Sequence, residues 1–530
     1  MTYDSFVRDR LPMPEDQPDF VFDLPELDYP EWLNAAVELL KGGDPASPAV
    51  VNAQGSWRYG EIADLSDRIA RLLAEEEGLY PGNRVLLHGP NGAMLFTAWL
   101  GILKAGGIAV ATMPILRGGE IAKILTRAQV SHAIVDSRCL EDFDTGAQEA
   151  ATVVSRLVYD GDAGSGGLEA RLRDVAPGYV PVDTSRDDPA LIAFTSGTTG
   201  VPKGCVHYHR DILASADSFA RHVLKPERGM RWLCSAPLAF TFGLGMQFAF
   251  PFRFSGTAVT LEKPGPAALL DTIEGFGVDV LATAPTAYRA MLGHLDGRDL
   301  SSLTICVSAG EHLPAATWQD WQAATGIGII DGIGATEMMH IFISASGGDI
   351  RPGATGKAVP GYRATVLDDN GEPMKVGTGR LAIKGPTGCR YLDDERQHDY
   401  VIAGWNVTGD TYRLDEEGYF WFVARSDDMI ISSGYNIAAP EVEAALYGHP
   451  AVRECAVVGV PCEERGQLVK AFVVAADGWE NGDALAEALQ SHVKAAIAPY
   501  KYPRAIEFVA ALPKTATGKL QRYALRRRIE

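Results

Sequence analysis

The chain of 530 residues is 46% hydrophobic and 22% charged, a composition typical of globular proteins with two or more domains. Its formal net charge of −20 argues against nucleic-acid and anionic-membrane binding, because an acidic surface repels both. The acidic, Pro-rich start lacks the apolar core of a signal peptide, and no run of about twenty apolar residues follows that could span a membrane. The seven cysteines are scattered, without the close spacing of a metal site. These features predict a cytoplasmic protein with reduced thiols and no zinc site.

Short apolar runs alternate with amphipathic segments through most of the chain. A helix is predicted over Trp32–Leu40. Its buried face is predicted to consist of Leu33, Ala36, Val37 and Leu40. Strands are predicted at Val85–Leu87, Ala133–Val135, Leu191–Phe194, Val280–Ala282, Ile305–Val307 and Ile327–Ile330. The alternation indicates an α/β fold, in which helices cover both faces of parallel sheets.

The pattern changes near residue 425. Beyond this point, the predicted elements are strands at Ala456–Val460, Lys470–Val474 and Ile506–Val509 and a helix around Leu485–Ile497. The polar residues 425–428 read as a linker. The sequence therefore predicts a large domain of residues 1–424, a hinge at 425–428 and a small α+β domain of residues 429–530.

The most informative segment is TSGTTGVPKG, residues 195–204, which follows the predicted strand Leu191–Phe194. Its glycines let backbone N–H groups approach an anion, its hydroxyls donate hydrogen bonds, and Lys203 adds positive charge. It is not a Walker loop, because Pro202 and Gly204 occupy positions where that motif needs Gly and Ser or Thr. The segment therefore predicts a polyphosphate cradle.

Four later motifs add polar groups at loops. GIGATE (332–337) follows a predicted strand and ends in Glu337, a carboxylate that suits a phosphate site as a Mg²⁺ ligand. SAGE (308–311) offers small residues as a floor for a planar ligand. Asp410, beside a predicted hairpin, is suited to accept from two ribose hydroxyls, and Lys519 follows a small-residue loop. Taken singly, each motif also fits an ordinary turn or surface loop.

Together these motifs resemble the acyl-adenylate-forming (AMP-binding) enzymes, which include acyl-CoA synthetases, carrier-loading adenylation domains and beetle luciferases. The resemblance runs from near residue 30 to the end and rests on TSGTTGVPKG, GIGATE, VTGD, ARSDD, SSGYNI and PKTATGK. It implies a large domain of layered sheets and helices with a β-barrel-like subdomain. It also implies a small mobile domain that turns about Asp427.

The chemistry that this resemblance implies has two half-reactions. A carboxylate attacks Mg·ATP to give an acyl-adenylate and pyrophosphate, and the CoA thiol then displaces AMP. The residues assigned to ATP and AMP are Thr195, Ser196, Gly197, Thr198, Thr199, Gly200, Lys203, Gly310, Glu311, His312, Asp331, Gly332, Ile333, Thr336, Asp410, Phe422, Arg425 and Lys519. The catalytic residues would be Lys519, Thr336, Glu337 and Lys203, with Glu337 on Mg²⁺. After adenylation the small domain would withdraw Lys519 and present Ser433, Gly434 and Tyr435 to CoA.

The segments DGIGATEMMHIF, SSGYNIAAPEVE and APYKYPR resemble the benzoate and 2-aminobenzoate CoA ligase branch, whose acids are compact aromatics. The residues expected around the acid are Phe240, Ala309, Gly310, Ile333, Gly334 and His340. We predict an ortho-substituted benzoate, salicylate or anthranilate, with His340 either bonding the ortho group or packing beside the site. Benzoate itself, or loading of a carrier protein in place of CoA, remains an alternative. A monomer or homodimer is expected.

Overall fold

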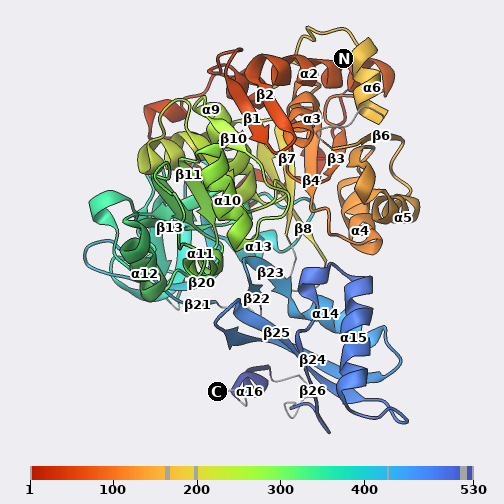
Figure 1. The fold of residues 1–530 in the computed structure, drawn as a ribbon, viewed down its shortest axis with the longest axis vertical. Helices are drawn as coiled ribbons and strands as arrows, with labels where there is room; N and C mark the ends of the chain where they lie inside the picture. Colours follow the sequence, from red (N-terminus) through yellow and green to blue (C-terminus); the bar gives the residue numbers. More distant parts are fainter. Residues whose placement is uncertain are drawn as a thin grey trace.

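Four β-sheets organise the described chain, which comprises residues 3–161, 167–195, 201–368, 370–425, 429–513 and 522–527 of the computed structural model. Three sheets belong to the larger N-terminal part, and the fourth forms the smaller C-terminal part, blue in Figure 1. The α/β class with a large and a small domain is confirmed. The exact domain boundaries stay a prediction, and the hinge residue Asp427 lies outside the described residues.

The first sheet has the order β6-β5-β3-β4-β7-β8 and is parallel up to its last strand, β8, which pairs antiparallel with β7. The strands are β3 (Arg84–His88), β4 (Ile108–Thr112), β5 (His132–Asp136), β6 (Ser155–Tyr159), β7 (Pro189–Thr195) and β8 (Lys203–Tyr208). Helices α3 (Ala93–Lys104), α4 (Gly118–Ala128) and α5 (Leu140–Ala150) connect the parallel strands. The predicted strands in this region are confirmed. Strand β8 was not predicted, because Lys203 and His207 interrupt its apolar run.

The second sheet has the order β15-β14-β13-β12-β11-β9-β10-β1-β2. Its strands are β1 (Pro48–Asn52), β2 (Gly55–Arg58), β9 (Arg231–Cys234), β10 (Thr257–Val259), β11 (Val280–Thr283), β12 (Ile305–Ser308), β13 (Ile329–Gly334), β14 (Ile341–Ser344) and β15 (Lys357–Ala358). The six strands from β1 to β13 in this order are parallel. The SAGE and GIGATE segments therefore lie at the carboxyl ends of neighbouring parallel strands, β12 and β13, where α/β sheets bind ligands.

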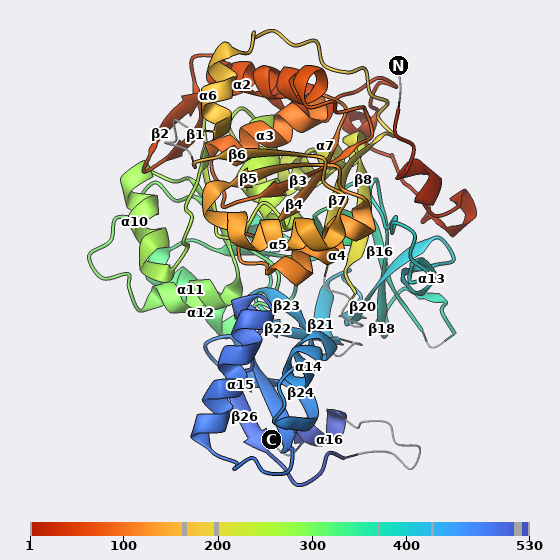
Figure 2. The same cartoon turned by 90° about the vertical axis from the view of Figure 1, so that its right-hand side faces the viewer.

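The third sheet is antiparallel and is the part predicted as barrel-like. It contains β16 (Arg363–Leu367), β17 (Pro373–Met374), β18 (Gly377–Lys384), β19 (Val401–Ile402), β20 (Trp405–Leu414) and β21 (Phe420–Arg425), and the expected hairpin is the β20–β21 pair. The fourth sheet contains β22 (Met429–Ser432), β23 (Tyr435–Ala438), β24 (Val452–Cys462), β25 (Gly466–Ala475) and β26 (Ala505–Phe508). Helices α14 (Ala439–Tyr447) and α15 (Asp483–Ala496) pack on it, and α16 (Arg522–Arg527) follows. Figure 2 shows this small unit below the three larger sheets.

The predicted face of the first helix is partly wrong. The helix α1 spans Ala35–Leu40, and the side chain of Asn34 caps it by accepting a hydrogen bond from the Ala36 N–H. Leu33 therefore lies before the helix, although it is buried. The buried helical residues are Ala35, Ala36 and Leu39. Val37 is 38% exposed, so the buried face is displaced by about one position from the predicted one.

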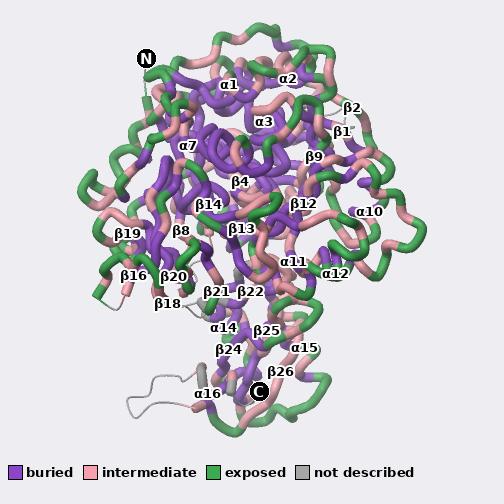
Figure 3. The backbone as a smooth tube through the Cα atoms, turned by 90° about the vertical axis from the view of Figure 1, so that its left-hand side faces the viewer, coloured by how far each residue is buried: buried purple, intermediate pink, exposed green. Residues whose placement is uncertain are grey.

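One apolar core cluster joins the first and second sheets. It includes Leu87 of β3, Val280 of β11 and the fully buried Trp99 of α3. Figure 3 shows this buried interior in purple. Helix α3 is apolar on nearly every side, as expected of a helix enclosed in a core. Other helices are α2 (Tyr59–Arg71), α6 (Gly167–Asp174), α7 (His209–Ser215), α8 (Thr241–Gly243), α9 (Phe250–Arg253), α10 (Pro266–Phe276), α11 (Pro285–Leu292), α12 (Ala315–Thr325) and α13 (Gln397–Tyr400). None of the helices in the described ranges is long and apolar enough to span a membrane.

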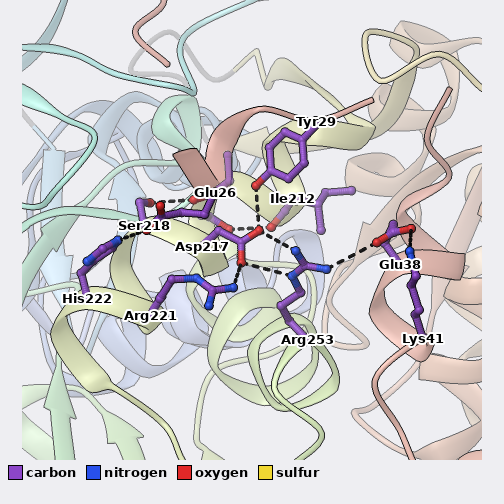
Figure 4. A network of polar contacts seen from close by, with 12 residues as sticks. Glu26, Tyr29, Glu38, Lys41, Ile212, Asp217, Ser218, Arg221, His222 and Arg253 are labelled. Atoms are coloured by element: carbon purple, nitrogen blue, oxygen red, sulfur yellow. Dashed lines mark hydrogen bonds and ion pairs between the residues drawn. The ribbon is translucent and has the colours of Figure 1, made fainter. Parts of the chain in front are cut away.

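A buried carboxylate ties the N-terminal segment to the core (Figure 4). Asp217 lies in the π-helical segment η6 (Ala216–Leu224). Its fully buried carboxylate accepts hydrogen bonds from Tyr29 Oη at 2.8 Å, Arg221 at 2.7 Å and Arg253 at 2.8 Å. Because Arg253 ends α9, this network fixes η6 against α9. Both elements supply rings that pack around His340, Phe219 from η6 and Phe250 from α9.

Candidate active site

The predicted phosphate end of the site lies at the β7–β8 hairpin. Thr195 is the last residue of β7 and pairs with Lys203, the first residue of β8. The ammonium of Lys203 donates to Tyr391 Oη at 2.6 Å and lies 3.7 Å from Glu337 Oε1. Glu337 is only 7% exposed. The fold therefore brings together the predicted cation and the predicted Mg²⁺ ligand, which are far apart in the sequence.

Tyr391 is a site residue that the sequence did not reveal. Its hydroxyl donates a hydrogen bond to the Glu337 carboxylate while it accepts one from Lys203. Burial and the nearby carboxylate of Glu337 raise the pKa of Tyr391 well above its usual value, so the phenol keeps its proton. No phosphate-binding motif includes this position, and an isolated bridge to Cys205 of β8 brings it to the site.

A buried histidine fixes the loop that carries Thr336. His207 of β8 contacts the carbonyl oxygen of Thr336 through Nε2 at 2.7 Å. Burial alone would lower the pKa of His207, but Cys205 and Asp211 raise it above its usual value. Because a carbonyl oxygen can only accept, the ring donates through Nε2–H. His207 is fully buried and holds the GIGATE loop against the β7–β8 hairpin.

The predicted ribose ligand lies in the same cavity as the phosphate residues. Asp410 is 7% exposed on β20, and the backbone of Arg425 lies opposite it on β21. A cavity of about 410 Å³ is lined by Asp410 together with Lys203, Thr336 and Glu337. This grouping supports the interpretation of these segments as one nucleotide site.

A second cavity, of about 670 Å³, lies at the predicted adenine position. Glu311, His312 and Phe422 line it, and the His312 and Phe422 rings stack at 5.4 Å. Burial raises the pKa of Glu311 to about 7, and its carboxylate accepts a hydrogen bond from the N–H of Gly434 in the small domain. Nearby, burial raises the pKa of Asp331 on β13 to about 8. Gly332 follows it on the same strand.

A third cavity, of about 570 Å³, contains most of the predicted acid-binding residues. Its lining includes Phe240, Ala309, Gly310, Gly334 and His340 from the large domain, and Ser433, Gly434 and Tyr435 from the small one. The predicted CoA loop therefore faces the predicted acid pocket. Ile333 is half-buried on β13 and packs against the core; it is not among the described residues that line this cavity.

His340 lies in an aromatic enclosure on the wall of this cavity. Its side chain is 2% exposed, and the ring centroids of Phe219, Phe242 and Phe250 lie 5.5, 5.7 and 4.5 Å from its own. Gly245 leaves space for the ring, because a Cβ there would come within 2.4 Å of it. Burial lowers the pKa of His340 to about 3, so the imidazole is neutral. Neither ring nitrogen makes a hydrogen bond of normal geometry in the described part of the chain.

Several predicted residues lie outside the described ranges. These are Ser196, Gly197, Thr198, Thr199 and Gly200 of the phosphate loop, the hinge Asp427 and the catalytic candidate Lys519. For Arg425, only the backbone position is described. The roles expected of them remain predictions.

Comparison with known proteins agrees with this arrangement. The AMP-binding enzyme family model matches residues 41–390, and the AMP-binding enzyme C-terminal domain model matches residues 441–519. The benzoate–CoA ligase of Thauera aromatica is 37% identical over 513 residues, 95% of this chain and 97% of that protein. The structure of the anthranilate CoA ligase AuaEII with anthranoyl-AMP is 34% identical, with a TM-score of 0.74 over 96% of this chain and 99% of that one. A benzoate CoA ligase from Burkholderia xenovorans LB400 is 32% identical, with a TM-score of 0.70 over 93% of this chain and 100% of that one.

Proposed function

Because this chain belongs to the AMP-binding enzyme family and is an AMP-forming aryl acid–CoA ligase, we propose that its preferred acid is an ortho-substituted benzoate, salicylate or anthranilate. The observation that carries this proposal is His340, a neutral imidazole on the wall of the acid cavity whose ring nitrogens make no hydrogen bond of normal geometry with the described residues. A buried polar group without a partner is costly, and a ligand that supplies the partner removes the cost.

The ortho substituent is the group of such an acid that suits His340. A neutral imidazole has one donor and one acceptor nitrogen, so it can pair with a hydroxyl or an amine on the ring. The penalty for leaving a buried polar group unpaired is about 1–3 kcal/mol, or about 5- to 150-fold in affinity. Benzoate would leave His340 unpaired and is expected to be the poorer substrate by a factor in this range. Apolar walls alone would discriminate less between these acids.

In the first half-reaction, Lys203, Thr195 and the rest of the phosphate loop would hold the β- and γ-phosphates, and Thr336 the α-phosphate. Mg²⁺ at phosphate sites takes one or two carboxylates together with substrate oxygens, and the buried Glu337 beside Lys203 fits that donor set. When bound, the ion would neutralise charge on the phosphates. Asp410 would hold the ribose, and Lys519 would align the acid carboxylate with the α-phosphate.

In the second half-reaction, a turn of the small domain about Asp427 would replace Lys519 by the loop Ser433–Tyr435. The contact between Gly434 and Glu311 supports this assignment, because it sets the loop against the adenine and acid cavities. The thiol of CoA would then reach the acyl-adenylate through the cavity that this loop lines. A carrier-bound thiol is the alternative acceptor.

An acid-dependent assay of pyrophosphate release with ATP and CoA tests this proposal. The panel is benzoate, salicylate, anthranilate and a short fatty acid, with thioester formation measured on CoA and on a phosphopantetheinyl carrier protein. We expect the highest kcat/KM for salicylate or anthranilate and thioester on CoA. A higher kcat/KM for benzoate than for both ortho-substituted acids would overturn the acid assignment. Product on the carrier alone would overturn the acceptor.

A further inference from the structure

A buried ion cluster joins the small domain to helix α4, and its three side chains lie on the wall of the cavity that Lys203 and Glu337 also line. We propose that Glu120 and Lys501 are positioning residues that hold the small domain in the orientation for thioester formation. We call the contact the Glu120–Lys501 clamp. The inference rests on the proposed function, because it assigns the present orientation to the second half-reaction.

The clamp is built from three charged side chains in two domains. Lys501, in the turn η10 (Pro499–Lys501), places its Nζ 2.6 Å from Glu120 Oε1 of α4 and 2.7 Å from Glu441 Oε1 of α14. The three side chains are between 5% and 11% exposed. The second carboxylate oxygen of Glu120 accepts from the Ala498 N–H at 2.8 Å. A single carboxylate on the large domain thus receives two hydrogen bonds from the small domain.

The pairing across the domains depends on their orientation, whereas the rest of the cluster does not. Lys501 and Glu441 both belong to the small domain and can stay paired when it turns. When the small domain turns, Glu120 would lose its two partners there, Lys501 and the Ala498 N–H. It would keep the hydrogen bond that it accepts from the backbone N–H of Arg117, at the start of α4, at 3.0 Å. Burial alone would lower the pKa of Lys501, but Tyr500, Glu441 and Glu120 raise it, so the residue is an ammonium. A buried ammonium deprived of one carboxylate is strongly unfavourable, so removing Glu120 disfavours this orientation.

A line of stacked rings connects the clamp to the acid cavity. Tyr500, next to Lys501, stacks on Tyr435 with ring centroids 4.2 Å apart. The Tyr435 ring meets the edge of Phe240, on the wall of the acid cavity, at 6.1 Å. On the other side of the same loop, Gly434 donates to Glu311. The clamp therefore fixes one side of the loop that faces the acyl group, and Glu311 fixes the other.

The chain offers a matched control for each partner. Glu61 caps α2 as Glu120 caps α4, since each accepts the backbone N–H of an arginine three residues earlier. Glu61, however, is exposed on the large domain. Lys470 pairs with Glu507 at 2.7 Å inside the small domain. Changing Glu61 or Lys470 therefore removes a similar charge without touching the domain contact.

The test compares the two half-reactions in Glu120→Gln and Lys501→Met. Adenylation is followed by acid-dependent ATP–pyrophosphate exchange. Thioester formation is followed in single turnovers that start from CoA and a supplied acyl-adenylate. The acyl group is that of the benzoate-type acid with the highest kcat/KM in the acid panel. We expect the single-turnover rate to fall at least about tenfold, equivalent to ~1.4 kcal/mol, with exchange retained. Glu61→Gln and Lys470→Met should retain both rates, and the double variant Glu120→Gln/Lys501→Met should lose little more than either single one.

Three outcomes would overturn the clamp: an unchanged thioester rate, equal losses in both half-reactions, or losses that multiply in the double variant. Thermal melting identifies a variant that does not fold. If Glu120→Gln does not fold, Glu120→Asp and Lys501→Met provide the test; if Lys501→Met does not fold, the two Glu120 variants provide it. Failure of the acid assignment can be distinguished from failure of the clamp. A different preferred acid would serve in both half-reactions, and it would not alter how each variant changes the thioester rate relative to the exchange rate.

Discussion

At the scale of single residues, the phosphate site is a contact between three side chains of different chemistry. Lys203 and Glu337 have opposite charges, and Tyr391 lies between them as a hydrogen-bond acceptor for one and a donor for the other. Such a bridge holds a cation and a carboxylate apart at a fixed distance. In the proposed function, this arrangement would preorganise the site for phosphate on one side and a metal ion on the other.

We expect Tyr391→Phe to lower the rate of ATP–pyrophosphate exchange by about tenfold, less than the ~10²–10³ for loss of a direct donor, because the phenol acts through its neighbours. The concentration of Mg²⁺ for half-maximal exchange should rise, since Glu337 loses an orienting donor. Tyr400→Phe is the control: its ring contacts that of Tyr391, and its hydroxyl has no hydrogen-bonding partner in the described residues. Equal effects of the two variants would contradict the role of Tyr391.

The buried Asp331 predicts a dependence of stability on pH. Burial raises its pKa to about 8, against about 4 in an unfolded chain. The native state holds the proton more tightly, so this contribution is present below about pH 4 and is lost as the pH rises to about 8. Asp331→Asn should therefore gain free energy of unfolding relative to the parent over that window. Urea unfolding at about pH 5 and about pH 8 measures the gain, and an identical difference at both pH values would contradict it.

Sequence motifs led to the residues that are expected to act on the ligand, and the fold brings three of them, Lys203, Glu337 and Asp410, to one cavity. Lys203, Glu337 and Asp410 were predicted because glycine-rich and hairpin segments surround them. Tyr391 and His207 were not, since each acts on another protein group and its partner is set by strand pairing over long separations. Ile333 was predicted from its motif position, yet its side chain packs against the core.

At the scale of elements, the acid cavity depends on how η6, α8 and α9 surround His340. Phe219 comes from η6, Phe242 from α8 and Phe250 from α9. The Asp217 network ties η6 to α9 and to the N-terminal segment (Figure 4). The position of the imidazole therefore depends on elements that the Asp217 network holds together.

We expect Asp217→Asn to lower the free energy of unfolding by about 2–3 kcal/mol. This lies below the range for breaking a fully buried pair, because Arg221 and Arg253 are partly exposed and can hydrate. Glu38→Gln is the control, because Glu38 pairs with Arg253 at 3.6 Å and with the exposed Lys41 at 3.1 Å, and such pairs contribute at most about 1 kcal/mol. Urea unfolding compares the two. A loss for Asp217→Asn no larger than that of the control would contradict the network's role.

Elements with unbroken apolar runs were predicted well, and elements shaped by local polar groups were not. The central strands β3, β5, β11 and β12 lie where the runs predicted them. Helix α1 was placed too early because the Asn34 cap, which a spacing pattern does not weigh, decides where it begins. Strand β8 carries the polar residues Lys203 and His207, which serve the site, so its apolar pattern is interrupted.

At the scale of the whole molecule, two domains meet over one set of cavities. The large domain supplies the residues predicted to bind phosphate, ribose and acid, and the small one supplies the loop Ser433–Tyr435. The family motifs predicted this division, but the orientation of the domains was not predictable. It depends on contacts such as that between Glu120 and Lys501, 381 residues apart, that no local pattern encodes.

If the small domain adopts two orientations, Lys519→Ala should impair the first half-reaction and leave the second unchanged. Acid-dependent ATP–pyrophosphate exchange should fall by about 10²–10³, because a cation placed on the reacting groups is lost. Thioester formation from a supplied acyl-adenylate and CoA should be spared, since that step uses the orientation without Lys519. Comparable losses in both assays would mean that Lys519 has no separate role in adenylation.

The most direct test of the account's central claim compares two acids in two proteins. We predict that the parent enzyme has a higher kcat/KM for anthranilate or salicylate than for benzoate, by about 5- to 150-fold. In His340→Phe, which retains an aromatic ring in the enclosure but removes both nitrogens, this ratio should fall toward one, with benzoate still activated. A ratio that is unchanged in His340→Phe, or that favours benzoate in the parent, would contradict the assignment of His340 to the ortho substituent.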